Sequence, residues 1–236
     1  MTQKKIIRIC AVVMALSGVV ILVSSIYPIL SYEWDAAQRY PILISPLVNE
    51  SKGDFKFSGD DSAKASTWVE GAKSSDFNLP DVKYFNITIP RLKINNATVA
   101  IGSEDLAHYL IQFPGTALPG KIGNTVVFGH SILPMYFDPK NYMSIFSTLQ
   151  NLGRGDYIYV DYDGINYTYK VESMFEVKPN DTQILEQTSS GSYISLVTCS
   201  PPGHPLKPRR LIVRASLIPQ SNSDQKGKEA NANTRS

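Results

Sequence analysis

The sequence predicts a mostly β domain, closed into a barrel, behind a single N-terminal transmembrane helix. Two observations lead to this prediction. Residues 9–32 contain no charged side chain, and residues 81–218 consist of short segments rich in β-branched and aromatic residues with turn residues between them. Many short strands of this kind are typical of barrels and sandwiches. A barrel is preferred here because closure leaves no exposed sheet edge.

The apolar run at residues 9–32 is long enough to cross a membrane, which takes about 20 residues of helix. Lys4, Lys5 and Arg8 precede the run, and an excess of positive charge before a span places that side in the cytoplasm. We therefore expect residues 1–8 to be cytoplasmic and the chain after the span to be extracellular. The alternative is a cleaved signal peptide, for which the run is long and lacks a clear small-x-small cleavage site.

The rest of the chain divides into three regions. Residues 33–80 contain scattered Pro, Ser, Gly and Asp without a sustained period, which favours a stalk or linker. Residues 81–218 form the expected barrel. Residues 219–236 are polar with few large apolar side chains, so we expect a disordered tail.

Alternation and composition place the strands within the barrel region, and Asp163-Gly164 indicates a hairpin turn. Two segments, Glu104–Leu110 and Met143–Asn151, are expected to be short helices. The expected strands are Tyr84–Ile89, Ala97–Ile101, Thr125–Phe128, Asp156–Tyr162, Asn166–Val171, Ser192–Thr198 and Leu211–Leu217.

The charge of the chain argues against nucleic acid as a partner. The formal net charge is +2 over 236 residues, and Lys207–Arg210 is the one basic cluster beyond residue 10. Proteins that bind nucleic acid generally carry a much larger basic surface.

The two cysteines raise a question about Cys199. Cys10 lies inside the predicted span, so Cys199 has no partner in the external part of its own chain. An unpaired thiol outside the cytoplasm is exposed to oxidation. A catalytic nucleophile, a buried structural residue and an intermolecular disulfide all fit composition alone.

Strand ends supply the groups that could work with Cys199. His130 follows the strand at Thr125–Phe128, and loops at strand ends often hold catalytic residues. His108 is better explained as structural, whereas His204, five residues from Cys199, is a minor candidate. Arg209 and Arg210 begin the strand after the Cys199 loop. A thiol, an imidazole and a guanidinium together would suffice for acyl transfer, as nucleophile, proton carrier and oxyanion donor.

Three separated motifs resemble the sortase family. Leu196-Val-Thr-Cys199, followed by Pro and Gly, is similar to the family's cysteine signature, with Ser195 where the family often has Thr. The segment from Pro114 through Gly-Asn-Thr-Val-Val-Phe-Gly to His130 is similar to the segment that leads to the family's catalytic His. Arg210-Leu-Ile-Val-Arg-Ala is similar to the strand with the family's Arg.

The resemblance implies a closed eight-stranded barrel and a cysteine transpeptidase. By motif, His130, Cys199 and Arg210 are the expected catalytic residues, Thr198 is an expected substrate-binding residue, and Arg209 could substitute for Arg210. The expected substrate is an LPXTG-like sorting signal, transferred as a thioacyl group to an amine of the cell wall or of another surface protein.

The resemblance also indicates which features the chain is expected to lack. We expect no cofactor and no bound metal. Pilin-polymerising sortases commonly carry an Asp-Pro-aromatic lid motif and a second membrane span, and neither is recognisable here, which favours an anchoring role. The alternative from a different class is a non-catalytic, membrane-tethered surface scaffold on a sortase-like barrel.

Overall fold

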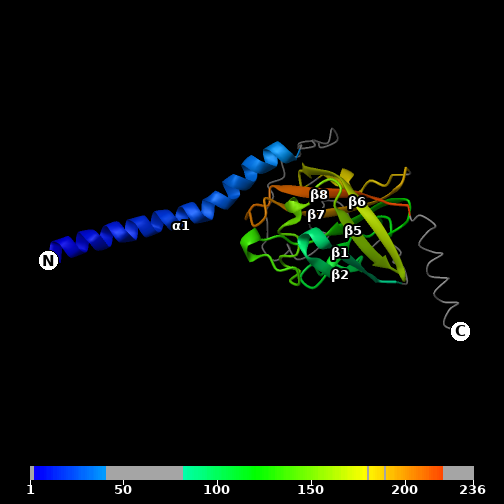
Figure 1. Cartoon of the computed structure of the whole chain (residues 1–236), viewed down its shortest axis with the longest axis horizontal. Helices are drawn as coiled ribbons and strands as arrows, with labels where there is room; N and C mark the ends of the chain where they lie inside the picture. Colours follow the sequence, from blue (N-terminus) through cyan, green and yellow to red (C-terminus); the bar gives the residue numbers. More distant parts are fainter. Residues whose placement is uncertain (1–2, 41–81, 180, 189, 220–236) are drawn as a thin grey trace.

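The structure, a computed structural model, describes residues 3–40, 82–179, 181–188 and 190–219. A long helix, α1, leads into a closed barrel of eight strands, and this confirms the predicted fold class (Figure 1). Most of the predicted stalk and nearly all of the predicted tail lie outside the described residues.

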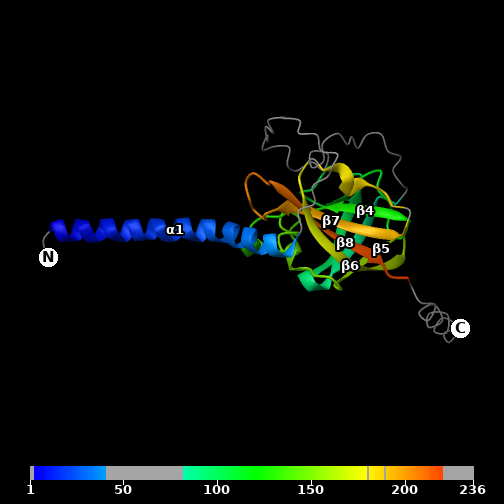
Figure 2. The same ribbon diagram turned by 90° about the horizontal axis from the view of Figure 1, so that it is seen from above.

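Helix α1 (Gln3–Arg39) is longer than the predicted span at residues 9–32. Its segment Ile7–Ala36, 30 residues, is apolar enough to cross a membrane. The described side chains of residues 7–27 are exposed, and the helix extends away from the barrel (Figures 1 and 2). The exposed apolar surface of this segment therefore suits lipid rather than water.

The barrel is closed by the strand order β1-β2-β3-β4-β7-β8-β6-β5, with β5 pairing back to β1. The pairs β2–β3 and β4–β7 are parallel, and the other pairs are antiparallel. The strands are β1 (Tyr84–Ile89), β2 (Ile94–Ile101), β3 (Leu110–Gln112), β4 (Gly123–Phe128), β5 (Tyr157–Tyr162), β6 (Ile165–Val177), β7 (Ser192–Ser200) and β8 (Arg209–Leu217). Short 3₁₀ helices connect them: η4 (Pro90–Leu92), η5 (Pro134–Tyr136), η6 (Leu149–Asn151) and η7 (Thr182–Leu185).

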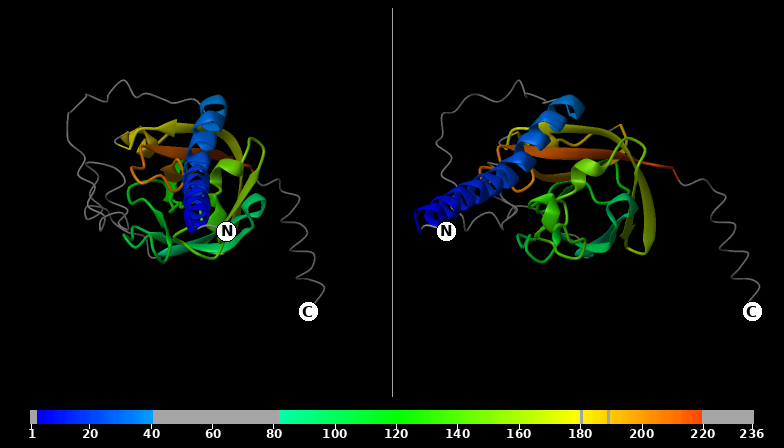
Figure 3. Two further views of the ribbon diagram at one scale, coloured as in Figure 1. Left: turned by 90° about the vertical axis from the view of Figure 1, so that its left-hand side faces the viewer. Right: turned by 60° about the vertical axis from the view of Figure 1, so that its left-hand side comes forward.

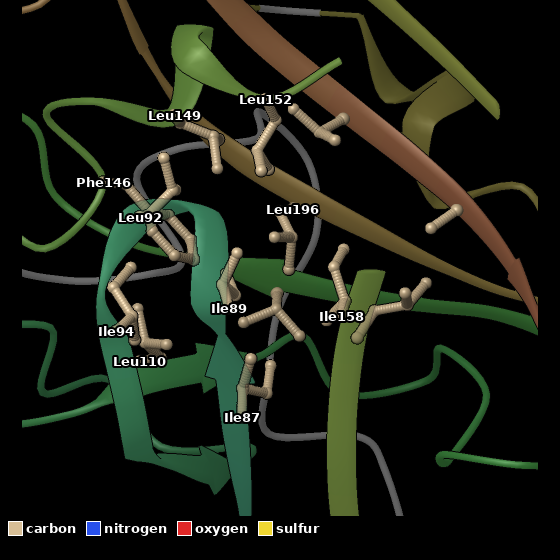
Figure 4. Close-up of a cluster of buried hydrophobic side chains, with 14 of the residues drawn as sticks. Ile87, Ile89, Leu92, Ile94, Leu110, Phe146, Leu149, Leu152, Ile158 and Leu196 are labelled. Atoms are coloured by element: carbon tan, nitrogen blue, oxygen red, sulfur yellow. The ribbon is translucent and has the colours of Figure 1, made fainter. Parts of the chain in front are cut away.

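Alternating side chains fill the barrel interior. Ile87, Ile158 and Leu196 are fully buried, and Figure 4 shows them pointing into one cluster with Phe146 and Leu149 from the loop after β4. Burying each such side chain contributes about 1.5–3 kcal/mol. The loop side chains therefore close one end of the barrel with apolar contacts.

A second apolar cluster, the outer cluster, covers the outside of β4, β7 and β8. It contains Val126, Phe128, Val197 and Ile212, and it also contains Cys199. Successive residues of a strand face opposite sides, so residues 197 and 199 lie outside the barrel whereas residue 196 lies inside. Cys199 thus belongs to the outer cluster and not to the barrel interior.

The C-terminal turns of α1 pack against the end of the barrel that Phe146 and Leu149 close. Tyr32, Ala36 and Tyr40 lie four residues apart on one face of the helix; Ala36 and Tyr40 belong to the interior cluster, and Tyr32 packs against it. The Tyr40 hydroxyl donates to the backbone carbonyl of Gln150 at 2.7 Å. Figure 3 shows the helix meeting the barrel at this end.

The two predicted helices in the barrel region are wrong. Glu104–Leu110 forms turns that lead into β3, and Asp105 Oδ1 accepts a hydrogen bond from the Ala107 amide. Such local side-chain bonds compete with a helix. Met143–Asn151 forms successive turns that end in η6, because Ser144 and Ser147 bond to carbonyls three residues back rather than four.

Candidate active site

Strand pairing places Cys199 and Arg210 on neighbouring strands and His130 just after the end of the third. In β7 and β8, Cys199 lies directly opposite Arg210. On the other side of β7, β4 runs parallel with Phe128 opposite Val197, and the pairing continues past β4 because the Gly129 amide donates to the Val197 carbonyl at 3.1 Å. Figure 2 shows β4, β7 and β8 side by side. His130 is therefore held next to Cys199.

All three side chains are nearly inaccessible to water. Cys199 is 3% exposed, Arg210 4% and His130 5%. Burial raises the pKa of the Cys199 thiol, and the nearby charges of Arg210 and Lys207 act in the opposite direction. Burial, together with Lys207, lowers the pKa of His130 to about 4. At neutral pH the thiol and the imidazole are therefore both predominantly uncharged.

The backbone around His130 is fixed by close packing at Gly129. A Cβ atom there would lie 2.4 Å from the Phe146 ring and 2.6 Å from the Leu110 side chain, so a larger residue does not fit without movement. Ser131 Oγ donates to the Cys199 carbonyl at 2.9 Å. These contacts on both sides of His130 limit where its ring can lie.

Thr198 faces the opposite side of β7 from Cys199. Its hydroxyl donates to the Gly129 carbonyl at 2.8 Å, and its side chain is fully buried. The structure therefore does not place Thr198 on the face shared by Cys199 and Arg210. Its hydrogen bond joins β7 to the residue that precedes His130.

The loop between β7 and β8 folds onto the loop that follows His130. Gly203 has a φ of +75°, and a Cβ atom there would lie 2.7 Å from the Leu133 backbone nitrogen, so this position requires glycine. His204 Nδ1 accepts from the Leu206 amide at 3.1 Å, and Arg210 Nη1 donates to the Lys207 carbonyl at 3.1 Å. The loop is thus held by its own polar contacts.

Arg209 belongs to a different network from Arg210. Its guanidinium pairs with the buried carboxylate of Glu176 at 2.7 Å. The other Glu176 oxygen, Oε1, accepts hydrogen bonds from Ser200 and, at 2.9 Å, from Tyr32, and the Tyr32 and Ser200 hydroxyls are 2.7 Å apart. Ser200 and Arg209 directly adjoin Cys199 and Arg210, so this network joins α1 to the strand ends that hold the candidate site.

His108 does not belong to this site. Its side chain is 75% exposed and its Nδ1 lies 2.9 Å from Asp105 Oδ2, within one surface turn. Within the described part of the chain, no group of three or more His, Cys, Asp or Glu side chains is placed to hold a metal ion.

Comparison with known protein families identifies the family to which the barrel belongs. The family model described as the sortase domain matches residues 87–218, more than half of the chain. The chain belongs to the sortase family. Since the matched residues run from β1 to the end of β8, the family assignment covers the whole described barrel.

Individual sortases are distant relatives. Sortase A of Streptococcus agalactiae serotype III (strain NEM316) is 25% identical over 169 residues, which are 71% of this chain and 65% of that protein. A sortase D5 transpeptidase of Clostridium perfringens is 26% identical with a TM-score of 0.50, covering 61% of this chain and 84% of the other. Sortase A of Corynebacterium diphtheriae is 27% identical with a TM-score of 0.51, covering 63% and 66%.

Two features of the site do not follow from the sequence motifs. Lys207 acts on both Cys199 and His130, and its only sequence signal is its place in the short basic stretch before β8. The contact of Tyr32 with Glu176 joins residues 144 positions apart. No local pattern predicts such a contact.

The Tyr32 network yields a stability prediction. Tyr32→Phe should lower the stability of the full chain by about 1–3 kcal/mol, because the buried Glu176 loses a hydrogen-bond donor. Thermal unfolding in detergent micelles measures the change. Tyr27→Phe is the matched control, since Tyr27 lies on the same helix and is 68% exposed. Equal unfolding temperatures for the two variants would contradict the prediction.

Burial of His130 predicts a loss of stability in acid. As the pH falls, the unfolded chain, with an ordinary His pKa of 6.5, takes up a proton before the folded chain, whose His130 pKa is about 4. The contribution of neutral His130 to the free energy of unfolding is fully present above pH 6.5. It falls by about 3 kcal/mol in all as the pH decreases to 4. Urea unfolding across this range should show the loss, and His130→Gln should flatten the profile. An unchanged profile in His130→Gln would show that other groups are responsible.

Proposed function

We propose that the chain is a membrane-anchored cysteine transpeptidase with Cys199 as nucleophile, His130 as proton carrier and Arg210 as oxyanion donor. The observation that supports this most directly is the pairing of Cys199 with Arg210 on β7 and β8, with His130 alongside, two residues after the end of β4. A thiol, an imidazole and a guanidinium on one face are the groups that acyl transfer requires.

The first half-reaction forms a thioester. The uncharged His130 ring accepts the thiol proton as the Cys199 sulfur attacks the scissile carbonyl, and the carbonyl π electrons move to oxygen. Arg210 donates hydrogen bonds to the oxyanion, a role that suits its planar fork of donors. The intermediate then expels the amine of the leaving peptide, which takes the proton from the His130 imidazolium. The acyl group remains on sulfur.

The second half-reaction runs the same steps with a different amine. The acceptor amine attacks the thioester carbonyl and gives a proton to His130. The carbon–sulfur bond breaks, and the leaving thiolate regains its proton from His130. A new amide bond forms while the enzyme returns to its starting state, so no net hydrolysis occurs.

The substrates follow from the family resemblance. An LPXTG-like sorting signal of a surface protein is the proposed acyl donor, and an amine of a cell-wall precursor or of another surface protein is the proposed acceptor. Thr198 supports this reaction through its bond to the Gly129 carbonyl, which keeps β4 and the His130 backbone in register with β7.

The proposed setting is the cell membrane. Helix α1 crosses it once, with Lys4, Lys5 and Arg8 on the cytoplasmic side. The barrel then lies on the outer face, where surface proteins emerge. Protease added to intact cells should digest this domain if the orientation is correct.

The three site residues predict a graded loss of activity. Cys199→Ala should abolish transfer of an LPXTG-like peptide to an amine while the barrel stays folded, because no other group forms the thioester. His130→Ala should lose nearly as much, and Arg210→Ala about 100- to 1,000-fold. Mass spectrometry of the products measures each loss.

Arg209→Ala and His204→Ala are the matched controls. His204→Ala should be mild, and Arg209→Ala should act mainly through stability, since it leaves the buried Glu176 without its cation. A folded Cys199→Ala protein that still joins peptide to amine would refute the mechanism and would favour a scaffold role for this barrel with the activity elsewhere.

The raised pKa of Cys199 predicts slow alkylation at neutral pH. In a Cys10→Ser chain, the rate with iodoacetamide should rise through a midpoint above that of an ordinary thiol, because only the thiolate reacts. Arg210→Ala should slow alkylation at pH 8, since it removes the charge that lowers this pKa most, whereas Lys121→Ala, at the far end of β4, should not. Equal rates in all three chains would show that Arg210 does not act on the thiol.

A further inference from the structure

The loops on either side of the candidate site expose large apolar side chains. Met135 and Tyr136, after His130, are 74% and 63% exposed, and Leu206, after Cys199, is 76% exposed. We call these three residues the apolar rim. Isolated exposed apolar residues are common, so what matters is where the rim lies relative to α1.

The rim borders a cleft between the barrel and α1. The cleft has a volume of about 730 Å³, and its lining includes Tyr27 and Trp34 from α1 together with Met135 and Pro202 from the two loops. Figure 1 shows both loops at the side of the barrel from which α1 departs. Met135 of the rim, the Pro202 loop that also bears Leu206, and the α1 segment around residues 27–35 therefore line the same cleft.

The length of α1 sets the depth of this segment in a bilayer. Arg8 marks the start of the span, and the hydrocarbon core, about 30 Å thick, is crossed by about 20 residues at 1.5 Å each. The core then ends near Pro28, and the headgroup layer takes up roughly the next five residues. Tyr27 and Trp34 flank this layer, where aromatic residues are enriched.

The polar contacts of Tyr32 fix the position of the barrel relative to the bilayer. The Tyr32 and Ser200 hydroxyls lie 2.7 Å apart, so the end of β7 sits at the outer edge of the headgroup layer. The loop that begins after Ser200 borders the cleft through Pro202, and the same cleft extends along α1 to Tyr27, about 7 Å nearer the membrane centre than Tyr32.

The charge of the two loops fits a phospholipid surface. Residues 201–208 contain Lys207 and no acidic residue, whereas Arg209, which follows, is paired with Glu176. The loop from Ser131 to Asn141 adds one Asp and one Lys. An apolar rim with an adjacent lysine and no excess of acidic residues is suited to the interface of an anionic membrane.

We propose that the apolar rim inserts into the headgroup layer of the membrane that α1 spans, so that this end of the barrel is a lipid-contacting surface. Membrane contact then fixes the height and tilt of the barrel, and the candidate site opens at the membrane surface. The inference depends on the proposed anchoring by α1 but not on the proposed chemistry.

Fluorescence quenching by lipid tests this surface on the full chain in nanodiscs. In a Cys199→Ala, Cys10→Ser chain, a single cysteine replaces Met135, Leu206 or Ile122 and carries an environment-sensitive label. Ile122 is the matched control, because it is apolar, 71% exposed and at the opposite end of β4. With lipids spin-labelled near the glycerol end of the acyl chain, labels at 135 and 206 should lose most of their fluorescence, whereas the label at 122 should retain it.

Two further measurements separate the possible failures. A label on native Cys10 in the Cys199→Ala chain should be quenched by lipid if α1 spans the bilayer. Absence of this quenching would overturn the anchoring and the proposal together. If Cys10 is quenched but residues 135 and 206 are not, the proposal alone is overturned. If residues 135 and 206 resist both lipid and water-soluble quenchers, a protein surface covers the rim and the proposal is equally overturned.

A charge substitution gives an independent check. Leu206→Asp should reduce lipid quenching of the label at residue 135, because a carboxylate resists entry into the interface. Ile122→Asp, the control, should leave that quenching unchanged. Equal quenching in both chains would contradict a role for Leu206 in lipid contact.

Discussion

The pairing of β7 with β4 on one side and β8 on the other is the constraint on which the site depends. His130 and Arg210 are 80 residues apart in sequence, yet each is held next to Cys199 by backbone hydrogen bonds. A slip of one residue in β8 would turn Arg210 to the opposite face, where Arg209 now pairs with Glu176. Register thus decides which arginine can reach the thiol and which one supports the strand ends.

Burial of the site shifts the pKa values of Cys199 and His130 in opposite directions, and both shifts favour the uncharged form of the group. The pKa of the thiol rises and that of the imidazole falls, for the same reason. A mostly protonated thiol is less readily oxidised, but only a small fraction of it is the reactive thiolate. Arg210 and Lys207 partly restore that population, because their positive charges favour the thiolate.

The sequence predicted the elements with strong local patterns and failed where tertiary contacts decide. Seven strands were expected from alternation, and each overlaps an observed strand. Strand β3, Leu110–Gln112, is too short to show a period and exists because Val99 and Phe128 lie beside it. The extension of β6 to Val177 was missed because a register shift between Val171 and Ser173 interrupts the alternation. The site residues were predictable as strand ends in recognisable motifs, whereas the partners of Glu176 were not.

The polar network around Glu176 connects α1 to the strand ends that hold the candidate site. A buried carboxylate is stable only with compensating partners, and here they come from β7, β8 and α1 at once. Moving α1 relative to the barrel would therefore remove a donor from Glu176 and loosen Ser200 and Arg209, the neighbours of Cys199 and Arg210. Because the apolar stripe of Tyr32, Ala36 and Tyr40 packs at the same place, polar and apolar contacts together set the orientation of α1 relative to the strand ends that hold the candidate site.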